Sequence, residues 1–175
     1  MSFCRILAGL DGSELSQSVF ETALEVAQQN QAEMLLFHCL TADVVIGPPL
    51  LTGDIGLSPH LVRQAYQSEC IQLEQQTHRA QEFLQKYYEI AVQSGIKTQL
   101  DYLITEAGTG ICRAAQTWNA DLIVLGRRGR KGFAEALLGS VSNYVLHHAH
   151  CAVLIVQGTS IQVSDARSQE IAASI

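Results

Sequence analysis

The sequence is short of the features that mark membrane and secreted proteins. Its 175 residues contain three prolines and one tryptophan, and only 16% of the residues are charged. No apolar run approaches the roughly 20 residues that a helix needs to cross a bilayer. The N-terminus has no charged segment followed by a long apolar stretch and a small-residue cleavage site. We therefore expect a cytoplasmic protein with no membrane partner.

Cysteine and histidine patterns typical of metal sites are also missing. The five cysteines are odd in number and widely spaced, so no CxxC pair is present for zinc or redox chemistry. His147, His148 and His150 invite a metal interpretation, but no acidic or cysteine motif accompanies them. Cationic residues also suit the C-terminal end of a helix. We predict no metal ligands, and we expect His38, inside a strand, to be a core histidine.

Basic residues are scarce overall but locally concentrated. Eleven Lys and Arg stand against 17 Asp and Glu, for a net charge of −6. A protein that grips nucleic acid along its backbone needs a basic face, so we expect no nucleic-acid partner. Four of the eleven basic residues nevertheless lie within residues 127–131.

The apolar content is sufficient for one folded domain. The chain length is typical of a single core, and 47% of the residues are hydrophobic. Beyond Gly158 the sequence is rich in Ser, Gln and Ala and short of large apolar residues. We expect one domain over residues 1–157 and a flexible tail over 158–175.

Hydrophobic periodicity predicts alternating strands and helices. The predicted strands cover residues 4–9, 33–40, 97–104, 121–125 and 152–156. The predicted helices cover residues 14–29, 59–94, 108–119 and 140–149, with Ser13 as the N-cap of the first. This order predicts an α/β fold with a single open, parallel, five-stranded sheet in the order 3-2-1-4-5 and helices on both faces.

Two segments before the third strand are less regular. Residues 41–58 hold two adjacent prolines and three glycines, which predicts a mobile loop. From Tyr66 to Ala91, apolar or small residues then recur at alternate spacings of four and three. This spacing suits a coiled-coil seam or a long helix lying on the sheet. We favour the second, because Cys70 and Thr77 are poor seam residues.

The predicted topology nominates a ligand site. In open α/β sheets, ligands bind outside the carboxyl ends of the strands where the winding reverses, here between the first and fourth strands. The segments that leave these strands are Asp11-Gly12-Ser13 and the glycine-rich run from Gly126. Gly139-Ser140 then opens a helix, whose free N–H groups suit a phosphate. From the loop alone, a solvated surface loop and a nucleic-acid patch remain alternatives.

The pattern Gly126-x2-Gly129-x9-Gly139-Ser140 resembles the ATP-binding signature of the universal stress protein family. Residues 6–13, 120–126 and 148–156 resemble the first, fourth and last strands of that family. The likeness covers about residues 3–157, with low specificity in 43–95. Arg127 stands where the family often has a small hydroxyl residue, and Ala152 where it usually has proline.

The resemblance implies an adenine-nucleotide alpha-hydrolase-like fold that binds ATP, AMP or ADP, with a divalent ion carried by the phosphates. Asp11 would contact the ribose hydroxyls, although it is also an ordinary turn residue before Gly12. The main chain around Cys39 would contact the adenine. The ribose and phosphates would be held by Gly126, Gly129, Gly139, Ser140 and Ser142. The remaining candidates are Gly12, Ser13, Arg127, Arg128 and Val141.

The resemblance further implies a stress-response regulator that forms a homodimer through the last strand, where pairing would cover an exposed sheet edge. A slow ATPase or nucleotidyl-handling enzyme is the alternative, and a module whose loop binds nothing is a third. The sequence has no Gly-x4-Gly-Lys-Ser/Thr loop, and the carboxylate nearest to the glycine-rich loop is Glu135. We therefore predict no catalytic residues.

Overall fold

The secondary structure follows the alternation of the apolar runs. The computed structural model describes residues 2–40, 59–127 and 138–157. The strands within these ranges are β1 (Arg5–Gly9), β2 (Glu33–Leu40), β3 (Thr98–Ile104), β4 (Leu122–Gly126) and β5 (Ala152–Val156). The helices between them are α1 (Leu15–Asn30), α2 (Pro59–Gln93), α3 (Ala107–Trp118) and α4 (Ser140–His148).

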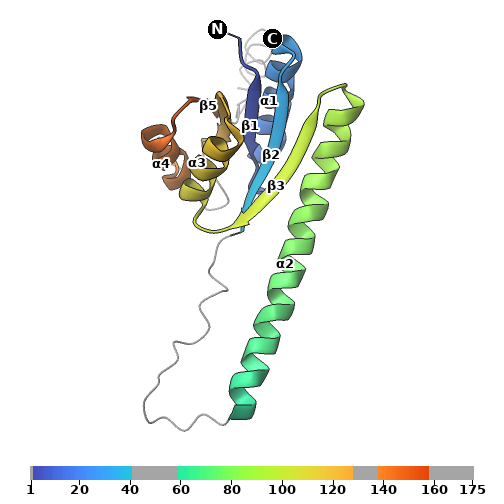
Figure 1. Ribbon diagram of the computed structural model, residues 1–175, viewed down its shortest axis with the longest axis vertical. Coiled ribbons are helices and arrows are strands. Elements are labelled where there is room, and N and C mark those ends of the chain that lie inside the picture. The colour runs from blue at the N-terminus through green and yellow to red at the C-terminus, as the bar shows by residue number, and fades with distance from the viewer. Residues whose placement is uncertain (1, 41–58, 128–137, 158–175) are drawn as a thin grey trace, which may run out of the picture.

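All five strands pair in parallel, in the order β3-β2-β1-β4-β5. The predicted topology is therefore confirmed. Helices α1 and α2 cover one face of the sheet, and α3 and α4 cover the other (Figure 1). The sheet is thus the middle of three layers, as a parallel sheet with crossover helices requires.

The central strand β1 contributes to both halves of the core. Ile6 and Ala8 pack toward α1 and α2, whereas Leu7 packs toward α3 and α4, and all three are fully buried. This alternation follows from the two-residue period of a strand. A fully buried Leu or Ile side chain contributes about 1.5–3 kcal/mol, so a short strand buried on both sides is a strong anchor.

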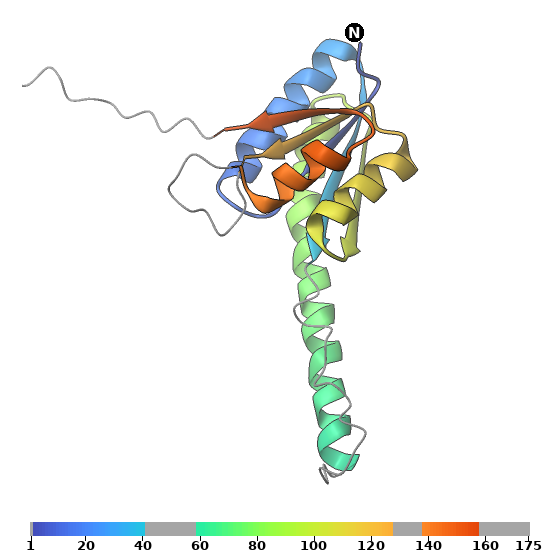
Figure 2. The ribbon, with the colours of Figure 1, turned by 90° about the vertical axis from the view of Figure 1, so that its left-hand side faces the viewer.

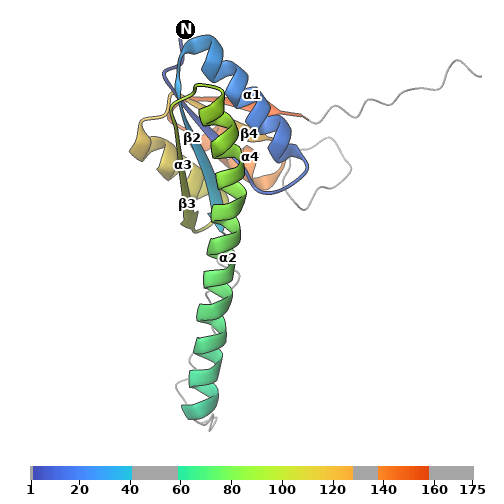
Figure 3. The same ribbon diagram turned by 90° about the vertical axis from the view of Figure 1, so that its right-hand side faces the viewer.

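The long helix α2 has two different halves. Its buried side chains recur at spacings of four, three and four at Ala80, Leu84, Tyr87 and Ala91. The N-terminal half projects beyond the sheet (Figures 2 and 3), and there Ile71 is 54% exposed. The predicted helix lying on the sheet is therefore confirmed for the C-terminal half alone. The predicted loop 41–58 and tail 158–175 lie outside the described residues.

No helix in the described ranges combines the length and the apolar character that crossing a membrane requires.

The predicted N-cap of α1 is wrong. Glu14, not Ser13, precedes the first helical residue, and no side chain among the described residues caps this helix. The Ser13 carbonyl instead accepts the N–H of Ser16 at 3.0 Å, which closes a turn before the helix begins. The sequence offered Ser13 as a cap, but the hydrogen bonds of the preceding turn decide where the helix starts.

Helix α3 has the side-chain cap that α1 lacks. The Glu106 carboxylate accepts the N–H groups of Gly108 (3.1 Å) and Thr109 (2.8 Å), and also the Thr109 hydroxyl (2.9 Å). These bonds, the one from the Thr109 N–H most of all, hold the pKa of Glu106 below its usual range. The carboxylate thereby satisfies N–H groups that have no acceptor inside the helix.

We predict that Glu106→Ala lowers the free energy of unfolding by about 1 kcal/mol at pH 7, the usual contribution of an N-cap. Because the folded pKa is depressed, the carboxylate contributes above the ordinary glutamate pKa, and the contribution is lost as the pH falls through the folded value. Urea unfolding of both proteins at pH 7 and pH 3.5 measures this. The difference between them should shrink at the lower pH, and a constant difference would contradict the assignment.

Candidate functional site

The turn between β1 and α1 is built around Asp11 and Ser16. The Ser16 hydroxyl accepts the N–H groups of Asp11 (3.2 Å) and Gly12 (3.0 Å) and donates to the Asp11 oxygen Oδ1 (3.1 Å). The same Oδ1 accepts the N–H of Ser13 at 3.0 Å. Gly12 has φ +75°, which glycine adopts without strain. The turn is therefore formed by its own side chains.

The Ser13 hydroxyl oxygen in this turn is buried without a hydrogen bond. In the part of the chain that the structure describes, it is the only buried side-chain nitrogen or oxygen atom in that condition. Buried polar atoms nearly always have a partner, so each exception needs an explanation. Here the unsatisfied oxygen lies in one of the two segments that the topology nominated for a ligand.

His38 lies beneath the same turn. Its side chain is buried, and Nδ1 lies 2.6 Å from the main-chain oxygen of Leu10, the residue before Asp11. The ring also meets the Phe83 ring of α2 edge-on, at 5.8 Å between centroids. The prediction of a core histidine is confirmed.

Strand β2 extends beyond β1. The pairing of β1 with β2 stops at Gly9 and Phe37, whereas β2 continues beside β3 as far as Leu40. The Cys39 thiol lies over the start of α3, 3.7 Å from the carbonyl oxygen of Ala107. The end of β2 is thus bordered by β3 and α3, while no strand among the described residues pairs with it on the β1 side.

Close packing fixes the Cys39 side chain. A Cβ atom on Gly110 would lie 2.6 Å from Cys39 Sγ and 2.7 Å from Thr105 Cγ2, so α3 reaches β2 because Gly110 has no side chain. Burial, with a smaller effect from the Glu106 carboxylate, raises the pKa of the Cys39 thiol to about 12. The thiol stays protonated at neutral pH and is no nucleophile. What Cys39 offers a ligand is its main chain.

The start of α4 is tied to the end of β4 by the carbonyl of Arg127. This carbonyl accepts the N–H of Gly139 and the hydroxyl of Ser142, both at 2.9 Å. The Arg127 N–H in turn donates to Val156 of β5 at 2.8 Å. The Ser142 hydroxyl hydrogen is therefore directed to the main chain. Among the predicted ligand-binding residues, Ser142 thus has a structural role, because its side chain holds the start of α4 to the end of β4.

The first turn of α4 presents main-chain donors. Gly139 is the N-cap residue, and no described side chain caps this helix. The first N–H groups of a helix have no acceptor within it. Since the Gly139 N–H is bonded to Arg127, the groups that remain are those of Ser140, Val141 and Ser142. Together with the partial positive charge of the helix N-terminus, they form a potential anion site.

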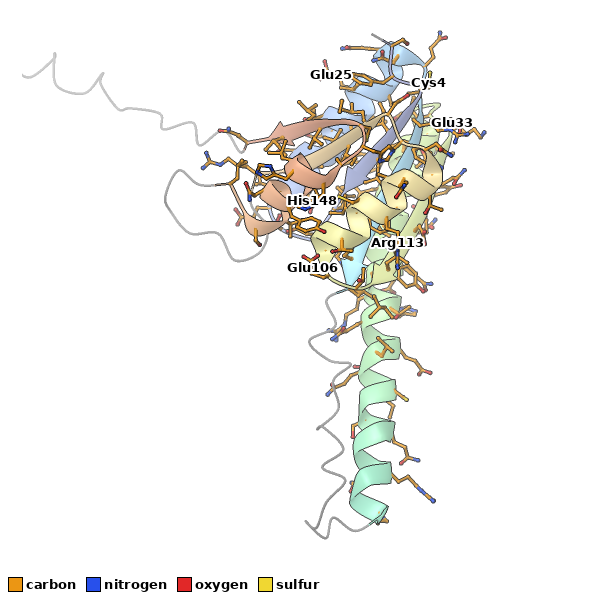
Figure 4. The ribbon with its side chains drawn as sticks, turned by 60° about the vertical axis from the view of Figure 1, so that its left-hand side comes forward. Cys4, Glu25, Glu33, Glu106, Arg113 and His148 are labelled. Carbon is orange, nitrogen blue, oxygen red and sulfur yellow. The ribbon has the colours of Figure 1, made fainter. Side chains whose placement is uncertain are left out.

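The two segments nominated by the topology, the Asp11 turn and the start of α4, lie at the carboxyl end of the sheet. Strands β1 and β4 are direct neighbours, with Gly9 opposite Leu125. The β1–α1 turn and the start of α4 therefore lie at the same end of the sheet (Figures 2 and 3). Figure 4 places Glu106 at this end, and Cys4 and Glu33 at the opposite one. Of the predicted residues, Arg128 and Gly129 lie outside the described ranges.

Ser16 is the residue that sequence reasoning missed. It is buried, and it stands three, four and seven residues before the buried Val19, Phe20 and Ala23 of α1. A polar residue on the apolar stripe of a helix was a signal that something is bonded there. The tertiary structure shows that its partner is the Asp11 turn.

The three histidines near the end of α4 do not gather around a common point. His148 donates its Nδ1–H to the Tyr144 carbonyl (2.8 Å), and its ring stacks on the Tyr144 ring. Within residues 2–40, 59–127 and 138–157, no group of three or more His, Cys, Asp or Glu side chains is placed to hold a metal ion.

Solved structures share this fold. Hypothetical protein MJ0577 superposes with a TM-score of 0.73 at 18% identity, over 90% of this chain and 98% of that one. An Arabidopsis thaliana universal stress protein family protein with AMP bound has a TM-score of 0.57 at 18% identity, over 90% and 93% of the two chains. The Archaeoglobus fulgidus universal stress protein in complex with dAMP has a TM-score of 0.55 at 20% identity, over 89% and 98%.

Sequence comparisons go beyond the fold. The model of the universal stress protein family matches residues 2–157. Universal stress protein Sll1388 of Synechocystis sp. is 38% identical over 161 residues, which cover 90% of this chain and 99% of that protein. The family match thus includes every element of the sheet together with the turn and the helix start that border the site. The chain belongs to the universal stress protein family.

Proposed function

We propose that this protein binds an adenine nucleotide, ATP or its products ADP and AMP, where the β1–α1 turn meets the start of α4. The nucleotide would regulate a stress response by setting the partners or shape of the protein. Relatives of the same fold have been determined with AMP and dAMP, which supports an adenine nucleotide as the ligand. The observation that carries the proposal is the uncapped first turn of α4 at the same end of the sheet as the Asp11 turn.

The phosphates would lie at the start of α4. The N–H groups of Ser140, Val141 and Ser142 supply donors there without a charged side chain. The Ser13 hydroxyl, buried and without a bond in the described residues, is a polar group that a ligand would satisfy. A divalent ion would arrive on the phosphates, since the described residues offer no acidic cluster to hold one.

The nucleoside would lie over the ends of β1 and β2. Asp11 is a carboxylate, and a carboxylate accepts hydrogen bonds from the ribose hydroxyls. The main chain of Cys39 would face the adenine, since β2 continues past the end of β1 there. Each part of the nucleotide thus has a partner of suitable chemistry at one edge of the sheet.

The site supports binding better than catalysis. The Cys39 thiol is protonated at neutral pH, and Asp11 Oδ1 is bonded to Ser13 and Ser16 of its own turn. The slow ATPase is therefore the weaker alternative. Steady ADP release well above the buffer rate, abolished in Gly129→Ala, would support the enzyme instead.

We also propose that one cytoplasmic domain over residues 1–157 pairs with a second copy through β5. Strand β5 is the last strand of the sheet, so it pairs with β4 on one side and forms an edge of the sheet on the other. Leu154 is 36% exposed, and Ala152 is also exposed. An edge with apolar residues and unpaired main-chain groups favours pairing with another strand.

We predict that Gly139→Val weakens ATP binding about tenfold or more, since a branched side chain at the N-cap obstructs the approach to the α4 amides. Isothermal titration calorimetry measures this. Leu138→Val, at the neighbouring exposed position, is the matched control and should retain the wild-type affinity. An unchanged affinity in Gly139→Val would remove the start of α4 from the site.

We predict that Asp11→Asn weakens binding of ATP by about tenfold or more and that of 2′-deoxy-ATP by much less, because a charged hydrogen bond is worth about 1.5–3 kcal/mol. The amide retains the Oδ1 that accepts from Ser13 and Ser16, so the turn should persist. Asp11→Ala loses both the negative charge and the Oδ1 acceptor, so it should bind ATP more weakly than Asp11→Asn does. Equal losses for the two nucleotides in Asp11→Asn would separate Asp11 from the ribose.

We predict that Ile155→Pro converts the dimer into a monomer. Since Ala152 donates to Asp121 and Val156 accepts from Arg127, the main chain of residue 155 points to the outer edge of β5. Proline there removes an outward donor and leaves the β4 bonds in place. Sedimentation velocity distinguishes the two states, with Ile155→Val as the control. A dimer that persists would show that pairing does not use this edge.

A further inference from the structure

The Asp11 turn is anchored from two sides. Ser16 of α1 holds it through the N–H groups of Asp11 and Gly12. On the other side, Leu10 donates its N–H to Phe37 at 2.9 Å, and its carbonyl lies 2.6 Å from His38 Nδ1. The residue before Asp11 is therefore bonded to β2 at both its main-chain groups.

The second of these bonds replaces a main-chain bond of the sheet. In a parallel ladder, a residue donates to the residue before its partner and accepts from the residue after it. Leu10 follows this rule at its N–H, so its carbonyl would next accept the N–H of Cys39. No such bond is present among the described residues, and β1 stops pairing with β2 at Gly9. The imidazole of His38 takes the carbonyl instead.

The surroundings fix the imidazole in this position. The His38 side chain is 5% exposed, and its ring packs edge-on against Phe83. Phe83 packs on Tyr87 at 5.3 Å between ring centroids, and Tyr87 packs on Phe20 of α1 at 4.8 Å. Helices α1 and α2 thus support the ring from behind. Because a carbonyl only accepts, the Nδ1 atom must carry the hydrogen, which selects that tautomer.

We propose that His38 is a positioning residue for the nucleotide. Its Nδ1–H bond to Leu10 ends the β1–β2 ladder, which leaves the Cys39 amide available for the base and sets Asp11 at the ribose. This inference rests on the proposed function. Without the imidazole, the Cys39 N–H is the nearest main-chain donor for the Leu10 carbonyl. The ladder then extends by one bond and carries Asp11 toward β2, away from the ribose.

The test compares three variants that differ in where a donor is placed. In His38→Asn, the amide nitrogen stands at the same number of bonds from Cα as Nδ1, so it can still donate to Leu10. In His38→Gln, the nitrogen lies one bond farther, and His38→Leu has no donor. Calorimetry with ATP and 2′-deoxy-ATP gives the ratio of the two dissociation constants, with thermal unfolding as the measure of stability. In the wild type, nitrogen NMR of the imidazole identifies the tautomer without any ligand.

We expect the wild type and His38→Asn to prefer ATP by about tenfold or more, as a charged hydrogen bond to the ribose implies. In His38→Gln and His38→Leu, we expect the preference to fall to about threefold or less. A purely structural role would lower the melting temperature of all three variants and leave the ratio unchanged. If His38→Leu does not fold, the comparison of Asn with Gln decides.

The outcomes separate the two proposals. A wild type that binds no nucleotide overturns both the proposed function and the role of His38. A wild type that prefers ATP, with the same preference in His38→Gln and His38→Leu, overturns the role of His38 alone. So does a His38→Asn variant that behaves like His38→Gln, or an NMR spectrum in which Nε2 carries the hydrogen.

Discussion

Parallel pairing of β1 with both β2 and β4 is the constraint on which the rest of the structure depends. Because all strands run in one direction, their carboxyl ends meet at a single edge. The chain leaves that end after each strand, so the Asp11 turn and the start of α4 both lie there despite more than a hundred intervening residues. The close approach of β1 and β4 depends on Gly9, because a Cβ atom there would collide with the Leu125 side chain.

The resulting site is made largely of main-chain groups held in place by short polar side chains. Ser16 and His38 fix the turn after β1, and Ser142 fixes the start of α4 through the Arg127 carbonyl. Donors arranged in this way before a ligand arrives cost little to order on binding. That property agrees with the proposed binding of a nucleotide, in which the buried hydroxyl and imidazole groups position main-chain groups.

Family membership and site geometry contribute different parts of the argument. The universal stress protein family is shown by the match over residues 2–157 and by the Synechocystis relative. Solved structures of this fold in complex with AMP and dAMP support the proposal that the ligand is an adenine nucleotide. The geometry adds which groups of this chain are available and which are already bonded. The Cys39 thiol and the Ser142 hydroxyl belong to the second class, although both residues stand in the predicted set.

The sequence by itself determined the sheet, because buried strands and amphipathic helices are patterns of adjacent residues. Each predicted strand and helix boundary lies within one residue of the observed one, and the strand order placed Asp11 and Gly139 at one edge. Only the tertiary structure decided which part of α2 lies on the sheet. The four-and-three spacing of apolar residues already begins at Tyr66, whereas, among the described residues, the buried side chains of α2 begin at Ala80. The start of α1 and the partners of Ser16 and His38 also depended on the tertiary structure. Hydrogen bonds between residues distant in sequence leave no periodic pattern, so only the folded chain shows that Leu10 is held by an imidazole 28 residues away.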